Sequence, residues 1–274
     1  DKTAQYHAAL RYSHWNCALV PSDGALAPDG LSGYEVLIAG GVRVVEPELP
    51  ARLEAFVRGG GVLLAAEGAM AEDLYGRPLD TAKRLRLGFG EWLGAQETAL
   101  KLPATPLAGA FPGAVRRLPD LRPVDAAGGT VVVATADGRP VVVRRALGRG
   151  FVYALGADLA GYPLAKLLAA VLEDAASARG MKAVPDAWRS VEARTADGAL
   201  APNVLVSRRS YPTHHALLLL NRDEYRKSIR LKLPGLTGAW RATEALSSTR
   251  LQARDGWYEV SLEPSSPAVV LLER

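Results

Sequence analysis

The chain contains few of the residues that most often build catalytic or metal centres. Its 274 residues include one cysteine, Cys17, four histidines and two methionines. A single cysteine excludes an intrachain disulfide and any metal site that is built on several thiolates. Low cysteine usage favours a reducing compartment, and we expect the bacterial cytoplasm, although this composition leaves secretion open.

Long apolar runs are also absent. No stretch approaches the roughly 20 residues that a membrane-spanning helix needs. The segment DKTAQYHAALRYSHW carries polar and aromatic residues where the apolar centre of a signal peptide would lie. With 49% hydrophobic and 23% charged residues, the composition is that of a globular protein with a sizeable core, and we expect no membrane partner.

The excess of positive charge is small and scattered. The formal net charge is +4 at pH 7, and the arginines are distributed along the chain without a long basic block. Nucleic-acid binding usually needs a basic patch or stripe. We therefore expect no nucleic-acid partner.

The first 184 residues alternate between strand and helix patterns. Val36–Ala39 and Val62–Ala66 are continuously apolar, which is typical of strands in a parallel sheet that helices cover on both faces. Between them, Leu49, Leu53 and Val57 recur at helical spacing. We therefore predict an α/β domain with a parallel sheet over residues 1–184, with helices at 3–12, 47–58 and 163–180 and strands at 16–20, 36–39, 62–66 and 151–155.

Two features interrupt this alternation. The pair Asp137-Gly138 lies between apolar runs and predicts a hairpin turn. Residues 103–124 are rich in proline and glycine, and we expect an irregular excursion there.

The pattern changes near Pro185. From there on, short runs such as ALLLLN, KSIRLKL and AVVLLE are separated by turn residues, and no helix pattern is present. Several short strands with turn signals between them are typical of an all-β module. We predict an antiparallel β-sandwich domain over residues 185–274.

One stretch has the layout of a nucleophile elbow. In RGGGVLLAAEGAMAEDL, an apolar strand ends at Ala66, a glycine follows at Gly68, and we expect a helix after it. The residue at the nucleophile position is Ala66, or Glu67 in the next register. Ala66 has no nucleophilic atom, and we expect Cys17 to be a buried, inert thiol on its strand. The sequence therefore predicts the geometry of an elbow without its chemistry.

The histidines do not form a metal motif. His214 and His215 are neighbours in an expected strand, so their side chains point to opposite faces. His7 and His14 are seven residues apart, and no cluster of carboxylates accompanies them. We expect no metal site and no cofactor.

Glu67, Glu72 and Asp73 follow the strand that ends at Ala66. The carboxyl edge of a parallel sheet is where ligands bind in open α/β folds. Acidic residues are also common at the start of a surface helix, and we favour that interpretation.

Four aromatic residues lie in or beside the all-β module. Trp188, Trp240, Trp257 and Tyr258 could stack on a sugar if their rings are exposed. Sandwich cores also contain tryptophan and tyrosine, and we favour core positions for them.

Several segments, in this order, resemble the non-catalytic C-terminal region of family 42 glycoside hydrolases, the bacterial β-galactosidases. The segments are LSGYEVLIAGG, LPARLEAFVRGGGVLLAAEG, LGFGEWLGA, GRPVVVRRALGRGFVYALGADL, ALLLLNRDEYRKSIRLKL, LTGAW and VSLEPSSPAVVLLE. The resemblance implies a flavodoxin-like trimerisation domain of the class I glutamine amidotransferase type, followed by a small terminal β domain. It also implies a homo-oligomer, as a trimer, and a catalytic barrel upstream.

The sequence departs from the family in two places. EGAMAED is less acidic than the family's segment, and it lacks the usual Ser-Gly. The family's domain also opens with a strand before its first helix, whereas this sequence opens at the expected helix. We expect an apolar slot where that strand would lie, and we expect the chain to be part of a longer protein. Because the family's two catalytic glutamates lie in the barrel, we assign no catalytic residue here.

Two other functions stay open from the sequence. One is a stand-alone amidotransferase-like hydrolase that uses acidic residues near Glu67. The other is a carbohydrate-binding module in which Trp240 or Trp257 stacks on sugar.

Overall fold

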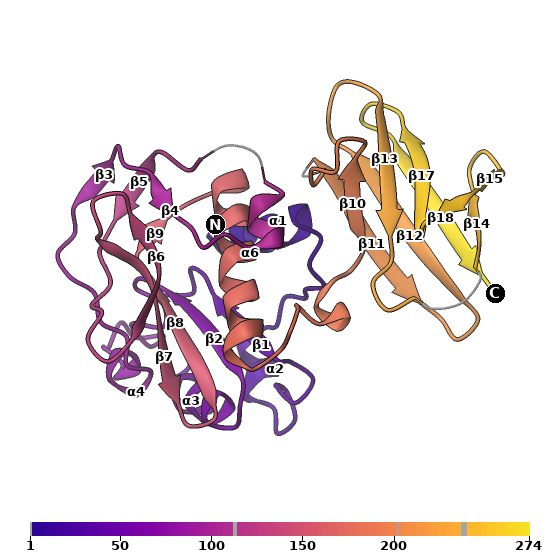
Figure 1. Ribbon diagram of the computed structural model, residues 1–274. Coiled ribbons are helices and arrows are strands. Elements are labelled where there is room, and N and C mark those ends of the chain that lie inside the picture. The colour runs from indigo at the N-terminus through magenta and orange to yellow at the C-terminus, as the bar shows by residue number, and fades with distance from the viewer. Residues whose placement is uncertain (1, 112–113, 202, 237–239) are drawn as a thin grey trace.

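The computed structural model describes residues 2–111, 114–201, 203–236 and 240–274 (Figure 1). Figure 1 shows a larger part with a mixed sheet and helices, joined to a smaller part made of strands. Three residues of the LTGAW segment and two of the proline-rich stretch, at 237–239 and 112–113, lie outside the described residues.

A six-stranded sheet forms the centre of the larger part. β1, β2 and β8 run parallel to one another, whereas β7 pairs antiparallel with β8, β6 with β7, and β4 with β6. In the order in which they pair, the strands are β1 (Val36–Ala39), β2 (Val62–Ala66), β8 (Gly150–Leu155), β7 (Pro140–Leu147), β6 (Thr130–Thr135) and β4 (Leu100–Lys101).

The prediction of a flavodoxin-like, glutamine amidotransferase-like domain with a parallel sheet is therefore wrong. The hairpin predicted at Asp137-Gly138 does join β6 to β7, and β7 then returns antiparallel beside β8. Half of the sheet is built from these local antiparallel pairings, and strands occupy more of the described residues than helices do. Continuous apolar sequence predicted the burial of β2 on both faces correctly, whereas β1 is only partly buried. It did not determine the direction of the strands.

Helices cover both faces of the parallel strands. α6 (Gly161–Ala178) packs with α1 (Lys2–Tyr12) on one face, in a core that includes Val62 and Leu64. α3 (Leu49–Arg58) lies on the other face, in a core with Leu63 and Ala65. The three predicted helices are confirmed, because in each one the apolar residues at helical spacing point toward the sheet.

Shorter elements connect these layers. A three-stranded sheet contains β3 (Gly94–Gln96), β5 (Leu118–Leu121) and β9 (Ala157–Asp158). The short helices are α2 (Ser22–Leu26), α4 (Thr81–Arg84) and α5 (Pro106–Gly109). The strand predicted at residues 16–20 is wrong: this segment has no assigned secondary structure, because no neighbouring strand is available for it to pair with.

The smaller part consists of two antiparallel sheets that share one core, as expected for a sandwich. Alternate residues of each strand face that core, for example Leu217 and Leu219, or Ile229 and Leu231. One sheet contains β10 (Glu192–Thr195), β13 (Lys227–Lys232), β17 (Trp257–Leu262) and β16 (Ala253–Arg254). The other contains β11 (Val204–Ser210), β12 (His214–Asn221), β18 (Pro267–Glu273), β14 (Arg241–Glu244) and β15 (Thr249–Leu251).

The two parts meet around His14, which follows α1. Its side chain is fully buried, its Nε2 lies 3.2 Å from the Val204 carbonyl oxygen, and its Nδ1 accepts a hydrogen bond from the Ala193 amide. These partners fit a neutral ring that is protonated at Nε2. Burial, with the nearby charge of Arg189, lowers the pKa of His14 to about 3.

The domain boundary at residue 185 stays a prediction. The η1 turn (Asp186–Trp188) follows it, but Leu200 packs in the core of the larger part. Residues on both sides of Pro185 thus contribute to one core. No helix among the described residues is long and apolar enough to cross a membrane.

Gly156 provides a test of the packing at the end of β8. A Cβ atom there would lie 1.9 Å from the Arg122 carbonyl oxygen, which is a backbone atom. We expect Gly156→Ala to lower the free energy of unfolding by about 2–3 kcal/mol, because the backbone must shift. Urea denaturation of the variant and the wild-type chain measures this change in the free energy of unfolding. Gly109→Ala is the control, since a Cβ there meets nothing within 4 Å, and a similar loss in both variants would contradict the packing.

His14 predicts a pH dependence of stability. Because its folded pKa lies below the ordinary 6.5, the stabilisation is present above pH 6.5 and is lost as the pH falls. We expect His14 to contribute a loss of roughly 2 kcal/mol in unfolding free energy between pH 7 and pH 5. Asparagine tolerates the positive φ of 62° at this position. His14→Asn should therefore fold, and its free energy of unfolding, measured by urea denaturation, should fall less between pH 7 and pH 5 than that of the wild-type chain. An equal fall in both proteins would contradict the lowered pKa of His14.

Candidate functional site

The turn after β2 is the position where the sequence predicted an elbow. No helix follows it: Gly68 has a φ of 72°, Met70 has a φ of 55°, and the next helix is α4, which begins at Thr81. The Thr81 hydroxyl donates to the Met70 carbonyl oxygen at 2.6 Å and holds this loop. The strand–turn–helix prediction is thus wrong. Without a helix N-terminus, this turn lacks the helix dipole that often helps to stabilise an oxyanion.

The acidic residues near this turn lie in a loop and not at a helix start, which corrects the interpretation we favoured. Glu67 forms an ion pair with Arg122 at 2.7 Å, and Glu72 accepts a hydrogen bond from Arg43. The Arg122 side chain also donates to the Gly90 carbonyl oxygen at 2.7 Å. The two carboxylates therefore tie neighbouring loops together and do not form an acid–base pair with each other.

Asp73 is the most buried of the three acids. Its carboxylate accepts hydrogen bonds from the Tyr75 and Arg77 amides and from the Arg77 guanidinium. Burial acts to raise the pKa of Asp73, but these hydrogen bonds outweigh it and hold the pKa below its usual value. A low pKa and a full set of donors are typical of a carboxylate that shapes a loop.

Sequence reasoning missed Trp92, which lies in the same region. Its side chain is 69% exposed, although its indole N–H donates to Asp120. The hydrogen bond orients the ring while its faces stay in contact with solvent. The residue lies within the quoted segment LGFGEWLGA, and a tryptophan flanked by turn-forming glycines was the signal that could have identified it.

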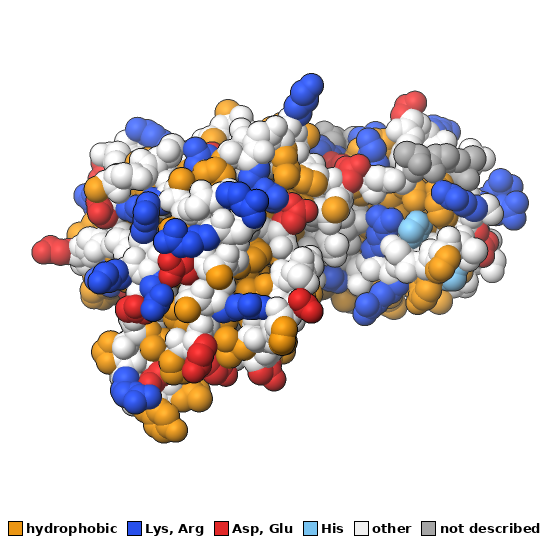
Figure 2. Space-filling view, turned by 90° about the horizontal axis from the view of Figure 1, so that it is seen from below, with side chains coloured by type: hydrophobic (Ala, Val, Ile, Leu, Met, Phe, Trp, Pro, Cys, Tyr) orange, Lys and Arg blue, Asp and Glu red, His pale blue; other side chains and the backbone are white. Residues whose placement is uncertain are grey.

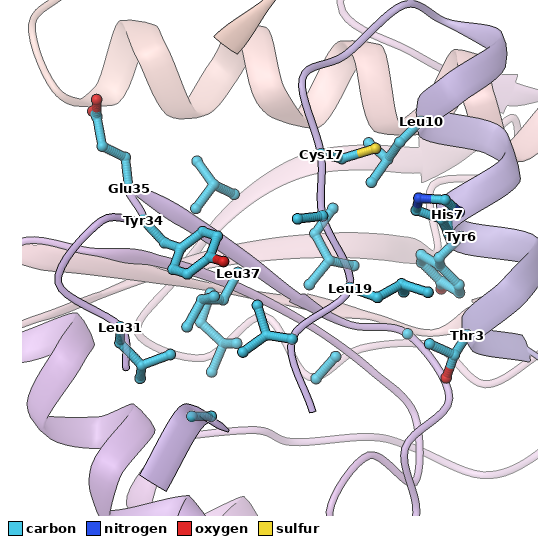
Figure 3. Close-up of a pocket in the computed structure, with 18 of the residues that line it drawn as sticks. Thr3, Tyr6, His7, Leu10, Cys17, Leu19, Leu31, Tyr34, Glu35 and Leu37 are labelled. Carbon is cyan, nitrogen blue, oxygen red and sulfur yellow. The ribbon is translucent and has the colours of Figure 1, made fainter. Parts of the chain in front are cut away.

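A cavity of about 620 Å³ lies beside β1. Figure 3 shows that its labelled side chains come from α1, from the segment that follows α1, and from β1 with the turn before it. Aliphatic side chains predominate, including Leu10, Leu19, Leu31 and Leu37. The cavity is thus a largely apolar hollow that borders β1.

Cys17 and His7 both line this cavity. Burial raises the pKa of the Cys17 thiol, against the opposing charge of Arg11. Burial also lowers the pKa of His7, and Arg11 acts in the same direction. A protonated thiol and a neutral imidazole in an apolar wall are poorly suited to nucleophilic catalysis.

The histidine pair lies at the start of β12. His214 stacks on Tyr211 with ring centroids 4.4 Å apart, and His215 lies against Trp240 at 4.9 Å. The structure thus places the two rings against different aromatic partners. Among the described residues, no group of three or more His, Cys, Asp or Glu side chains could hold a metal ion.

The aromatic residues considered for sugar stacking fall into different places. Trp188 is buried in the core of the larger part and Tyr258 in the sandwich core. Trp240 is partly buried against the sandwich core, beside Arg274. Trp257 is partly buried at its strand end, where Arg230 and Lys232 lie near its ring. None of these four residues is among the exposed aromatic residues of the described structure.

Charges of both signs are mixed on the surface. Figure 2 shows blue and red side chains interspersed on the visible face, without a broad region of one sign. Ion pairs that join different elements, such as Arg179–Glu35 and Arg144–Asp174, contribute to this mixing.

No protein-family model and no curated protein sequence matches the chain. Solved structures of β-galactosidases do match its fold. The enzyme from Rahnella sp. R3 superposes with a TM-score of 0.69 at 15% identity, over 100% of this chain and 36% of its own. The enzyme from Bacillus circulans sp. alkalophilus gives a TM-score of 0.66 at 18% identity, over 100% of this chain and 37% of its own.

A family 42 β-galactosidase from G. stearothermophilus, a catalytic mutant, gives a TM-score of 0.66 at 16% identity, over 100% of this chain and 36% of its own. The chain therefore spans little more than a third of these enzymes. At such low identity the similarity shows the fold alone. The described part of the chain has the fold of one region of these β-galactosidases.

The roles assigned to the acids can be separated by mutation. We expect Asp73→Asn to lower the melting temperature clearly, because it weakens three hydrogen bonds to a buried carboxylate. Glu67→Gln should change it little, since an ion pair between half-exposed side chains adds little stability. Differential scanning calorimetry of both variants measures this, and a larger loss for Glu67→Gln would contradict these roles.

Proposed function

We propose that this chain is the non-catalytic assembly and accessory region of a β-galactosidase-like glycoside hydrolase. In this proposal it holds subunits together, as a trimer, and braces a catalytic barrel located elsewhere in the protein. The observation that carries the proposal is the match of the whole chain to a region of about a third of several β-galactosidases.

The chemistry around β2 supports an assembly role over an enzymatic one. Ala66 occupies the elbow position, and Glu67, Glu72 and Asp73 are all engaged by arginines. A general acid or base needs a free carboxyl group at hydrogen-bond distance from the reacting atom. Here the carboxylates are already used to hold the loops, which favours a scaffold.

The exposed apolar side chains near this edge suit a subunit interface. Trp92 and Leu93 lie beside the Arg122–Glu67 pair, and Val44, Leu74 and Tyr75 lie beside the Arg43–Glu72 pair; all five are exposed. Tryptophan, tyrosine and arginine are the residues most enriched at the energetic centres of protein interfaces. We therefore place the proposed subunit contact at this rim, with Trp92 as its anchor.

Trp92→Ala tests the interface. We expect it to raise the dissociation constant of the oligomer at least about tenfold, because it removes a large anchor from the contact. Size-exclusion chromatography with light scattering over a dilution series measures this. Leu246→Ala is the matched control, since Leu246 is 68% exposed but lies on the sandwich, and its dissociation constant should not change.

Circular dichroism checks that both variants stay folded. If both variants keep the dissociation constant of the wild-type chain, the rim is not the contact. If both variants raise the dissociation constant to the same degree, the contact includes the sandwich.

A further inference from the structure

The apolar core of the sandwich gives way to polar side chains at one end of its five-stranded sheet. β11 presents Val204 and Val206 to the core, and both are buried. Because side chains alternate along a strand, the next residue on that face is Arg208. On the neighbouring β12, His215 comes two residues before the buried Leu217 and shares its face. Two polar side chains therefore lie where the apolar layers end.

The next two strands of this sheet add a cation and an aromatic ring at the same end. Arg274 comes two residues after the buried Leu272 of β18, and Trp240 comes two residues before the buried Ala242 of β14. The ring centroids of Trp240 and His215 are 4.9 Å apart, and the Arg274 Cζ lies 5.1 Å from the Trp240 centroid. Trp240 thus contacts both the imidazole and this guanidinium, which brings them close to each other.

Arg208 is oriented by uncharged partners. Its Nε donates to the Ser210 hydroxyl oxygen at 3.1 Å, and its Nη1 donates to the Pro234 carbonyl oxygen at 3.4 Å. Ser210 is the residue directly opposite His215 in the β11–β12 ladder, so the guanidinium lies near the imidazole. Neither hydrogen-bond partner neutralises the charge of Arg208.

The positive charges of this cluster have no counter-charge in the described part of the chain. Arg208 and Arg274 form no ion pair with any described carboxylate. Burial lowers the pKa of Arg208, and burial together with the charges of Arg208, His214 and Arg274 lowers the pKa of His215. The buried Nδ1 of His215 has no hydrogen-bond partner among the described residues. Like charges that are held together repel one another, so a bound anion would stabilise this arrangement.

The donors suit a phosphate or sulfate group. Arginine presents planar pairs of N–H donors that bind the oxygens of such groups two at a time. β12 lies between β11 and β18 in the sheet, so His215 lies between Arg208 on one side and Arg274 on the other. A neutral imidazole adds one ring N–H. A tetrahedral group with several anionic oxygens can accept hydrogen bonds from all three side chains at once.

We propose that Arg208, His215 and Arg274 form an anion site at this end of the sandwich, and that it binds one phosphate or sulfate group. The two guanidinium groups donate to its oxygens from two sides, and the imidazole donates from between them. Trp240 is a positioning residue that holds Arg274 and His215. Because Arg274 is exposed and the other two side chains are only partly buried, the group can be a free ion or part of a larger molecule.

Isothermal titration calorimetry with inorganic phosphate tests the site, with sodium chloride keeping the ionic strength constant. We expect saturable binding of one phosphate per chain. Arg208→Gln and Arg274→Gln should each raise the dissociation constant at least about tenfold, because each removes charged donors. Arg209→Gln is the matched control, since Arg209 is exposed and follows Arg208 on the opposite face of β11. This control should leave the dissociation constant unchanged, and circular dichroism checks that all three variants stay folded.

Nuclear magnetic resonance of the imidazole protons gives a second readout. Phosphate should raise the pKa of His215, because a nearby anion stabilises the charged ring. His214 is the internal control, since its ring stacks on Tyr211 with centroids 4.4 Å apart, and its pKa should rise less. In Arg274→Gln, which changes an exposed side chain, phosphate should no longer raise the pKa of His215 to the same degree.

The proposal is overturned if phosphate binding does not saturate, or if Arg209→Gln weakens it as much as Arg208→Gln does. Acetate that displaces phosphate as effectively as sulfate does would also overturn it, because the site would then be one for carboxylates. Phenyl phosphate distinguishes the two sources of the group. Tighter binding than that of inorganic phosphate supports a site for a phosphate ester, whereas equal or weaker binding supports a site for the free ion.

Discussion

The structure depends on the need of a few apolar strands to be covered on both faces. β2 and the central part of β8 have almost no exposed side chain, so helices must lie above and below them. α6 and α1 meet this need on one face and α3 on the other. At the outer edge of β1 the same need is unmet, and the cavity lies there.

This constraint also accounts for the chemistry of the loops. The loops after β1 and β2 have to leave the sheet without a helix beginning at the turn, and arginine–carboxylate pairs hold them in place. Glu67 and Glu72 therefore serve the scaffold. Trp92, oriented by Asp120 but open to solvent, is the exposed aromatic side chain on which the proposed subunit contact is centred.

Helices and individual strands could be predicted because apolar spacing reports which faces are buried. Strand direction could not, since an apolar run is equally buried in either direction; the hairpin at Asp137-Gly138 was the local signal for the antiparallel half. The segment Asn16–Val20 has the composition of a strand, but pairing requires a neighbour that sequence spacing does not reveal. Likewise, the burial of His14 depends on Val204 and Ala193, which are far away in the chain.

The central claim is that this fold assembles subunits, and the mass of the wild-type chain in solution tests it most directly. Sedimentation equilibrium over a range of concentrations gives that mass without reference to any one surface. The account predicts an association to three times the 29.1 kDa of one chain. A single species of 29.1 kDa at every concentration would contradict it.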